Sequence, residues 1–376
     1  MSAFDLYLEA SLVLSLMFAV WWAASRGLRR LGQAPGWQTQ RALLRFSFVA
    51  ALASPLLLRA LAALWPGWAS SSLGELPGLA GAVIALYFHG YLDIEPAALD
   101  RLVRMRESIR YGLSPQASPW ALGLWGLLAL GLTLRLGLLI RQAARLRGLL
   151  RRSHAWRRAG RLRLLVSDET AIPFSTGVPG RGRIVIPSWL LLHPADLRLA
   201  IAHEGQHLRG GDVAWAMLLE AAKLLFFWNP LVTLWAREHS RLAELACDEA
   251  VVARRRVSAY DYGGCLLRVS ARASRHGGPA RFAVGLTAAF GSAPRAGTFL
   301  ATRIRSLAAA RQARAPNRKG RAFAALILAA AVSLALLAHD AGGWNAQELH
   351  LATVVNLKSE AAGDRLPAFG LVMSYW

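Results

Sequence analysis

The sequence is poor in cysteine and in acidic residues. Its 376 residues include two cysteines, Cys247 and Cys265, which excludes a small scaffold held together by disulfide bonds. The chain has 22 acidic and 44 basic residues, which gives a formal net charge of +22. Charged residues make up only 18% of the chain and apolar residues 55%, so intrinsic disorder is excluded as well. Long apolar runs between basic clusters indicate an integral membrane protein.

The apolar runs predict four membrane-spanning helices, because a helix needs about 20 residues to cross a bilayer. We expect these spans at residues 6–25, 42–62, 120–140 and 322–338. Arg45 and Arg59, near the two ends of the second span, are expected to snorkel toward the interfaces. The apolar segment 76–92 is interpreted as an interfacial or re-entrant piece of the loop 66–119.

Basic residues gather after the first span, after the third and before the fourth, and the positive-inside rule puts these flanks in the cytoplasm. The N-terminus, the loop 66–119 and the tail 339–376 are then outside a bacterial inner membrane, and a domain of residues 141–321 is inside. We expect the arginine clusters to contact anionic lipids. Nucleic acid is not an expected partner, since no helix-turn-helix, zinc-finger or RNP pattern accompanies them.

Residues His203 to His207 read His-Glu-Gly-Gln-His and match the HExxH pattern. Two histidines four residues apart lie on one helix face, where both imidazoles can bind one metal ion. Glu204, next to the first histidine, can accept a proton from metal-bound water. The alternative is a surface helix with two unrelated histidines. A helical segment with Pro194 in its first turn and a stop at Gly210-Gly211 weighs against that alternative.

A catalytic zinc site needs a third protein ligand and one open position. Glu244 can be that ligand, on the periodic segment 235–253, and Asp248 one turn later can hold a ligand histidine by its outer N–H. Cys247 is interpreted as a small buried thiol, and Cys265 as free too. The apolar run 214–235 is interpreted as a buried or membrane-surface helix, because a crossing there would separate the histidines from Glu244.

Short runs rich in β-branched residues, 164–166 and 183–187, predict two strands. Together with the metal motifs they resemble the BlaR/MecR family of membrane zinc metallopeptidases. The similarity is carried by Ser167-Asp168-Glu169, Pro173-Phe174, Gly177, Arg183-Ile184-Val185-Ile186-Pro187, His203-Glu204-Gly205-Gln206-His207, Asp212, Phe226-Phe227-Trp228-Asn229-Pro230 and Glu244-Leu245-Ala246-Cys247-Asp248-Glu249-Ala250-Val251.

The resemblance implies a mostly α, integral membrane fold with an inserted α+β gluzincin-like domain. It implies Zn²⁺ held by His203, His207 and Glu244, with Glu204 as general base and Asp248 behind a ligand. It also assigns Arg183, Ile184, Val185 and Ile186 to an edge strand that binds the substrate in extended form, with a plain structural strand as the alternative. The family's β-lactam sensors carry a penicillin-binding domain after the last span, whereas the tail 339–376 contains no Ser-x-x-Lys, so no acylable serine is expected there.

We therefore expect a membrane-bound zinc endopeptidase that cleaves a cytosolic protein, such as a transcriptional repressor, or itself. Its partners would be this protein substrate, membrane lipids and, as an open question, a second copy of the chain. A non-proteolytic membrane signalling or scaffold protein with a retained zinc site is the main alternative, and the intact Glu204 speaks against it. A basic protein that binds nucleic acid or lipid is a third interpretation, which rests on charge alone.

Overall fold

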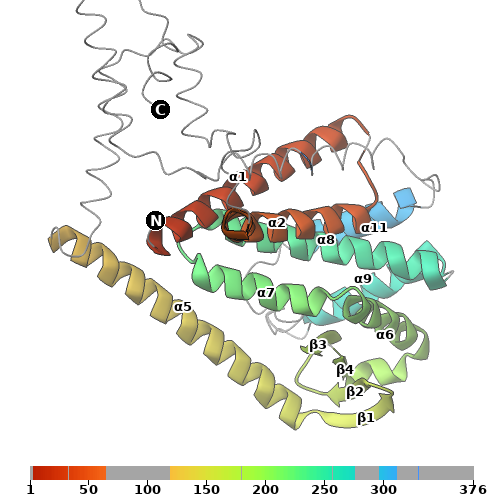
Figure 1. The fold of residues 1–376 in the computed structure, drawn as a ribbon. Helices are drawn as coiled ribbons and strands as arrows, with labels where there is room; N and C mark the ends of the chain where they lie inside the picture. The colour runs from red at the N-terminus through yellow and green to blue at the C-terminus, as the bar shows by residue number, and fades with distance from the viewer. Residues whose placement is uncertain are drawn as a thin grey trace, which may run out of the picture. The chain divides into compact units, whose positions relative to one another are not determined.

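The computed structural model describes residues 3–32, 34–64, 119–178, 180–255, 257–275, 296–310 and 329 (Figure 1). The predicted loop 66–119, the tail and nearly all of the fourth span lie outside these residues. The chain forms two compact units. One contains residues 1–17, 49–129 and 329–376, and the other contains residues 18–48 and 130–328. The histidines of the HExxH motif lie in the second unit.

Three long helices account for the apolar N-terminal part of the chain: α1 (Ala3–Arg30), α2 (Trp37–Leu64) and α5 (Pro119–Arg152). Among the described residues, Ala10–Arg30 and Leu122–Arg152 are long and apolar enough to cross a membrane. These segments overlap the first and third predicted spans. The second predicted span lies on α2, which does not meet the same criterion, so the layout of four spans stays a prediction.

The β-branched runs form strands, as the sequence predicted, in a four-stranded sheet of order β1-β2-β4-β3. The strands are β1 (His154–Ala159), β2 (Leu162–Ser167), β3 (Phe174–Val178) and β4 (Arg181–Pro187). Strand β4 pairs in parallel with β2 and antiparallel with β3. The β3–β4 turn needs a glycine at position 177, where φ is +130° and a Cβ atom would lie 2.3 Å from the carbonyl oxygen of Arg181.

The interior place of β4 corrects the assignment of residues 183–186 to a substrate-binding edge strand. Both backbone edges of β4 are already paired, and Ile184, Val185 and Ile186 are completely buried. A continuous β-branched run is typical of a strand covered on both faces, so these residues are structural. The edges of the sheet belong to β1 and β3.

Five helices follow the sheet and the short 3-10 helix η2 (Ser188–Leu192): α6 (Pro194–Arg209), α7 (Asp212–Leu225), α8 (Pro230–Arg255), α9 (Ala259–Arg275) and α11 (Ala296–Ala310). Helix α8 is central, because α6, α7 and α11 all contact it. The apolar run 214–235 is not one helix, since α7 ends at Leu225 and α8 begins at Pro230. Phe18 of α1 and Phe48 of α2 pack against Trp235 of α8, with ring centroids 5.4 and 5.2 Å away.

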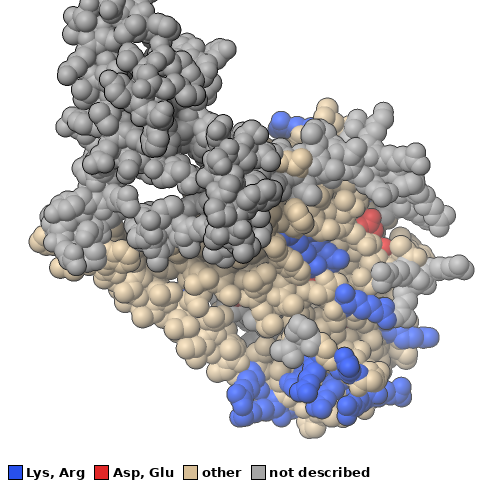
Figure 2. Space-filling view, viewed as in Figure 1, with Lys and Arg blue, Asp and Glu red and all other residues tan. Residues whose placement is uncertain are grey.

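Basic side chains gather at the end of the molecule that holds β1 and β2 (Figure 2). Every residue of β1 is exposed, including Arg157 and Arg158, and Arg161 and Arg163 are exposed just after it. Charge on an edge strand opposes pairing with another chain. The other edge strand, β3, contacts α6, the helix that carries His203 and His207.

Candidate metal centre

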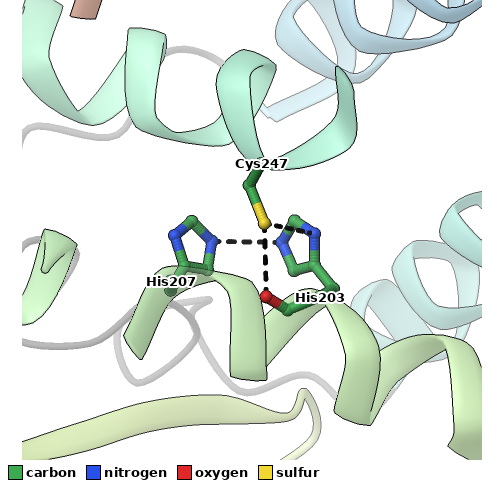
Figure 3. A group of neighbouring side chains, drawn as sticks. All are labelled: His203, His207 and Cys247. Atoms are coloured by element: carbon green, nitrogen blue, oxygen red, sulfur yellow. Dashed lines mark hydrogen bonds between the residues drawn. The ribbon is translucent and has the colours of Figure 1, made fainter. Parts of the chain in front are cut away.

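Helix α6 presents His203, Glu204 and His207, which are 8%, 7% and 7% exposed. The two histidines are one turn apart, and their rings lie edge to face, with the Nε2 atoms 3.2 Å apart (Figure 3). The helix begins at Pro194 and gives way to Gly210 after Arg209, as the sequence predicted. Two ring nitrogens that point into the same space are the arrangement that one metal ion requires.

Glu244 comes to the histidines from α8. One of its carboxylate oxygens lies 3.4 Å from Nε2 of His203, and the other lies 3.4 Å from Nε2 of His207. The side chains expected to bind zinc are therefore close together, although 36 residues and the whole of α7 separate His207 from Glu244 in the sequence. Packing of α6 on α8 brings them together.

The outer nitrogens of both histidines have polar partners. Nδ1 of His207 lies 2.8 Å from an oxygen of Asp212. Nδ1 of His203 lies 2.7 Å from the hydroxyl of Tyr262, which itself donates to Asp248 over 2.8 Å. Asp248 was expected behind a ligand histidine, and its nearer oxygen is 3.5 Å from Nδ1 of His203. Such partners fix the orientation of a metal-binding imidazole.

Cys247 is completely buried, as expected, yet it contacts the site. Its Sγ atom lies 3.3 Å from Nδ1 of His203 and donates to the carbonyl oxygen of the same residue over 3.2 Å (Figure 3). The atoms of His203, His207 and Cys247 that could bind a metal lie within 4.8 Å of one another, so this thiol is a second candidate for the third ligand. The geometry favours Glu244, because its carboxylate faces both Nε2 atoms, whereas the thiol meets the Nδ1 atom that Tyr262 also contacts.

The charges of the pocket suit a divalent cation. Burial alone would lower the pKa of His203, but Cys247, Glu244 and their hydrogen bonds raise it to about 10, and the pKa of His207 is also well above its ordinary value. Burial would raise the pKa of Glu244, but Arg303 and the histidines bring it well below its usual range. The pocket thus favours positive charge at the paired rings beside an ionised carboxylate, and a bound Zn²⁺ would satisfy both.

Glu204 turns toward the sheet. Burial raises the pKa of its carboxylate, while the two histidines and, to a smaller extent, Ser175 on β3 lower it. A carboxylate with a raised pKa is a better proton acceptor near neutral pH. The sequence did not indicate a role for Ser175, because its spacing from the HExxH motif follows no known pattern.

Several charged and polar groups at the site were missed in the sequence. Arg303 of α11 was interpreted as part of a basic cluster before the fourth span, but its Nη1 atom lies 2.9 Å from Glu244, and its Nε and Nη2 atoms lie 2.8 and 2.7 Å from Asp248. Arg45 was expected to snorkel from the second span, but it binds Asp212 in the interior. No pattern in the sequence indicated a role for Tyr262.

Comparison with known proteins gives one family. Residues 124–289 match the family model described as BlaR1 peptidase M56, and no curated protein or solved structure matches the chain significantly. The matched range contains the sheet and helices α6 to α9, with His203, His207 and Glu244, while Arg303 lies beyond it. Peptidases of this family are metallopeptidases, and the two candidate spans fit a membrane protein. The resemblance to the BlaR/MecR family is thus confirmed over residues 124–289.

Proposed function

We propose that the protein is a membrane-bound, zinc-dependent endopeptidase. The observation that carries this proposal is the convergence of three donors from two helices: Nε2 of His203, Nε2 of His207 and the carboxylate of Glu244. Three protein ligands leave one coordination position for water, which is the form of a catalytic zinc site. Glu204, buried beside them, is the general base.

When bound, Zn²⁺ supplies a Lewis acid that makes water more acidic and polarises a peptide carbonyl. Glu204 accepts a proton from the attacking water and returns it to the leaving amine nitrogen. Asp212 orients His207, and Tyr262 with Asp248 orients His203, so that both Nε2 atoms stay available as ligands. The carboxylates of Glu204, Asp212 and Asp248 are buried, so solvent does not weaken their electrostatic interactions by screening.

The edge of the sheet beside α6 is the place for an extended substrate. Strand β3 pairs with β4 along one side, and within the described residues no strand pairs with its other side. It contacts α6 and α7, and its Ser175 reaches Glu204. A peptide added to β3 would have its backbone bonded beside the general base, which is the β-augmentation mode of binding.

The substrate we propose is a cytosolic protein, such as a transcriptional repressor, or the protease itself. The basic flanks of the predicted spans support a cytoplasmic domain and an outside N-terminus. Helix α5 supports membrane attachment, since none of the residues in its most apolar window is buried. Leu134 and Leu127, for example, are 62% and 65% exposed, as expected for side chains that face lipid.

One observation favours a second candidate, a non-proteolytic protein with a structural zinc. If Cys247 joined His203, His207 and Glu244, four protein ligands would close the site, as in structural zinc centres. Substitution separates the two candidates. For a peptidase, Cys247→Ala keeps zinc and activity while Glu204→Gln keeps zinc and loses cleavage. For a structural site, Cys247→Ala loses zinc and no variant cleaves. Zinc content and cleavage of casein, measured on the full chain in detergent, distinguish these outcomes.

A further inference from the structure

Two arginines of α2 converge on one carboxylate of the catalytic domain. Nη1 of Arg41 lies 2.9 and 3.1 Å from the two oxygens of Asp212, and Nη2 of Arg45 contacts the nearer of them. All three side chains are nearly buried, at 11%, 13% and 8% exposure. They belong to the same compact unit, which contains residues 18–48 and 130–328. Two buried positive charges one helical turn apart repel each other, so both depend on Asp212.

Asp212 connects the two arginines to the proposed metal centre. Its second oxygen lies 2.8 Å from Nδ1 of His207, the nitrogen opposite the one that faces Glu244. The carboxylate therefore has two roles, since it holds the arginines of α2 on one side and orients a ligand imidazole on the other. Losing the arginines would leave a buried carboxylate with only the imidazole to bind, and its position would no longer be fixed.

The turn between α6 and α7 is shaped around the same arginines. Nη1 of Arg45 donates to the carbonyl oxygen of Gly210 over 2.7 Å, and Gly211 has the left-handed φ of +67°. A Cβ atom on Gly210 would lie 2.9 Å from Nη1 of Arg41 and 3.2 Å from the carbonyl oxygen of Gln206. The absence of a side chain at Gly210 lets the guanidinium group of Arg41 approach the C-terminal end of α6, whereas Gly211 allows the left-handed backbone of the turn.

Arg45 also reaches the helix that carries Glu244. Its Nε atom donates to Nε2 of His239 on α8 over 3.0 Å, and its guanidinium group stacks on Trp215 of α7 at 5.2 Å. His239 is 2% exposed, and burial together with Arg45 lowers its pKa to about 3, so it is neutral and can accept this bond. One side chain of α2 thus contacts α7, α8 and the end of α6.

We propose that Arg41 and Arg45 are positioning residues of the metal centre, which hold His207 in its ligand orientation through Asp212. This inference rests on the proposed zinc site. Both arginines belong to α2, the helix that carries the second predicted span. The position of α2 against the domain therefore determines the orientation of His207 and its affinity for the metal.

The test is zinc affinity, measured by competition with a chelator on the full chain in detergent. We expect Arg45→Gln, Arg41→Gln and Asp212→Asn each to weaken zinc binding by about 10- to 100-fold, the usual effect of losing a partner of a ligand histidine. In the Asp212→Asn background the arginine substitutions should add little, since they act through that carboxylate. The absorption spectrum of the Co²⁺-loaded variants should shift as well, because it reports ligand orientation.

Arg268→Gln is the matched control. Arg268 makes a comparable two-bond pair with Asp196, also on α6, but in its first turn and away from the histidines, so zinc affinity should not change. If the glutamine variants do not fold, Arg41→Lys and Arg45→Lys carry the test, since lysine keeps the charge but cannot form the same set of bonds. Wild-type affinity and spectrum in all folded arginine variants would overturn the inference. A wild-type chain that binds no zinc would instead overturn the proposed function.

Discussion

Nη1 of Arg303 lies 2.9 Å from Oε2 of Glu244, and the rest of the same guanidinium group binds Asp248 through two hydrogen bonds. A residue of α11 therefore contacts the expected third ligand and the aspartate behind the first histidine. Its guanidinium group is a main reason why the pKa of Glu244 is well below its ordinary value.

Replacing Arg303 should make zinc binding more sensitive to acid. Glu244 must be deprotonated to bind the metal, and without the guanidinium group its pKa rises, so protons compete with zinc at higher pH. We expect the pH at which half of the zinc is bound to move upward in Arg303→Gln and to move less in Arg303→Lys. The measurement is zinc content as a function of pH. An unchanged midpoint in the glutamine variant would show that Arg303 does not act on Glu244.

Removing the hydroxyl of Tyr262 should loosen His203. Tyr262→Phe keeps the ring in its buried site but loses the contacts with Nδ1 of His203 and with Asp248. We expect zinc affinity to fall by about 10-fold and the free energy of unfolding by about 1 kcal/mol. Tyr260→Phe is the control, because Tyr260 is 86% exposed on the same helix. Equal zinc affinities in both variants would rule out this role.

The hydroxyl of Ser175 should set the acid limit of catalysis. Ser175 lowers the pKa of Glu204, so we expect Ser175→Ala to raise that pKa. A general base works only when deprotonated, and the acid limb of kcat/KM against pH should therefore move to higher pH in the variant. The check is a pH profile with one peptide substrate. A limb that stays in place, or moves to lower pH, would contradict this contact.

The pair of Arg268 with Asp196 should stabilise the domain only above acid pH. The hydrogen bond from Arg268 holds the pKa of Asp196 below its ordinary value. Its contribution is thus complete above the unfolded pKa of about 3.9, and it is lost as pH falls through the lower folded pKa. Since Arg268 is 59% exposed, we expect Arg268→Gln to cost less than about 1 kcal/mol near neutral pH. Thermal unfolding of the wild type and of Arg268→Gln should be compared near neutral pH and in acid. The difference in stability between the two proteins should be smaller in acid. A difference that grows instead would have the wrong sign.

The residues proposed to bind the metal could be selected from the sequence because their geometry is local or strongly patterned. His203 and His207 share a helix face whatever the tertiary fold, and Glu244 belongs to a recognisable segment. The place of Ile184 and its neighbours within the sheet could not be predicted, since sheet order depends on pairing between strands that are not adjacent in the sequence. Strand β4 pairs with β2 as well as with β3, which makes an interior strand out of an expected edge.

The arginines were misjudged for a different reason. Arg45 and Arg303 lie in clusters whose composition alone is typical of the flanks of membrane spans. Only the packing of α2 and α11 on the domain shows that each reaches a buried aspartate. Tyr262 follows the HExxH motif by more than 50 residues with no fixed spacing, so its contact with His203 emerges from the packing of α9 against α6.

The central claim is that His203, His207 and Glu244 hold a zinc ion at which Glu204 acts as the base. Its most direct test compares wild type and Glu204→Gln, purified side by side in detergent, for bound zinc and for cleavage of casein or of the chain itself. The account predicts equal zinc in both proteins and cleavage by the wild type alone. Cleavage by the glutamine variant at the wild-type rate, or a wild-type protein that binds no zinc, would contradict it.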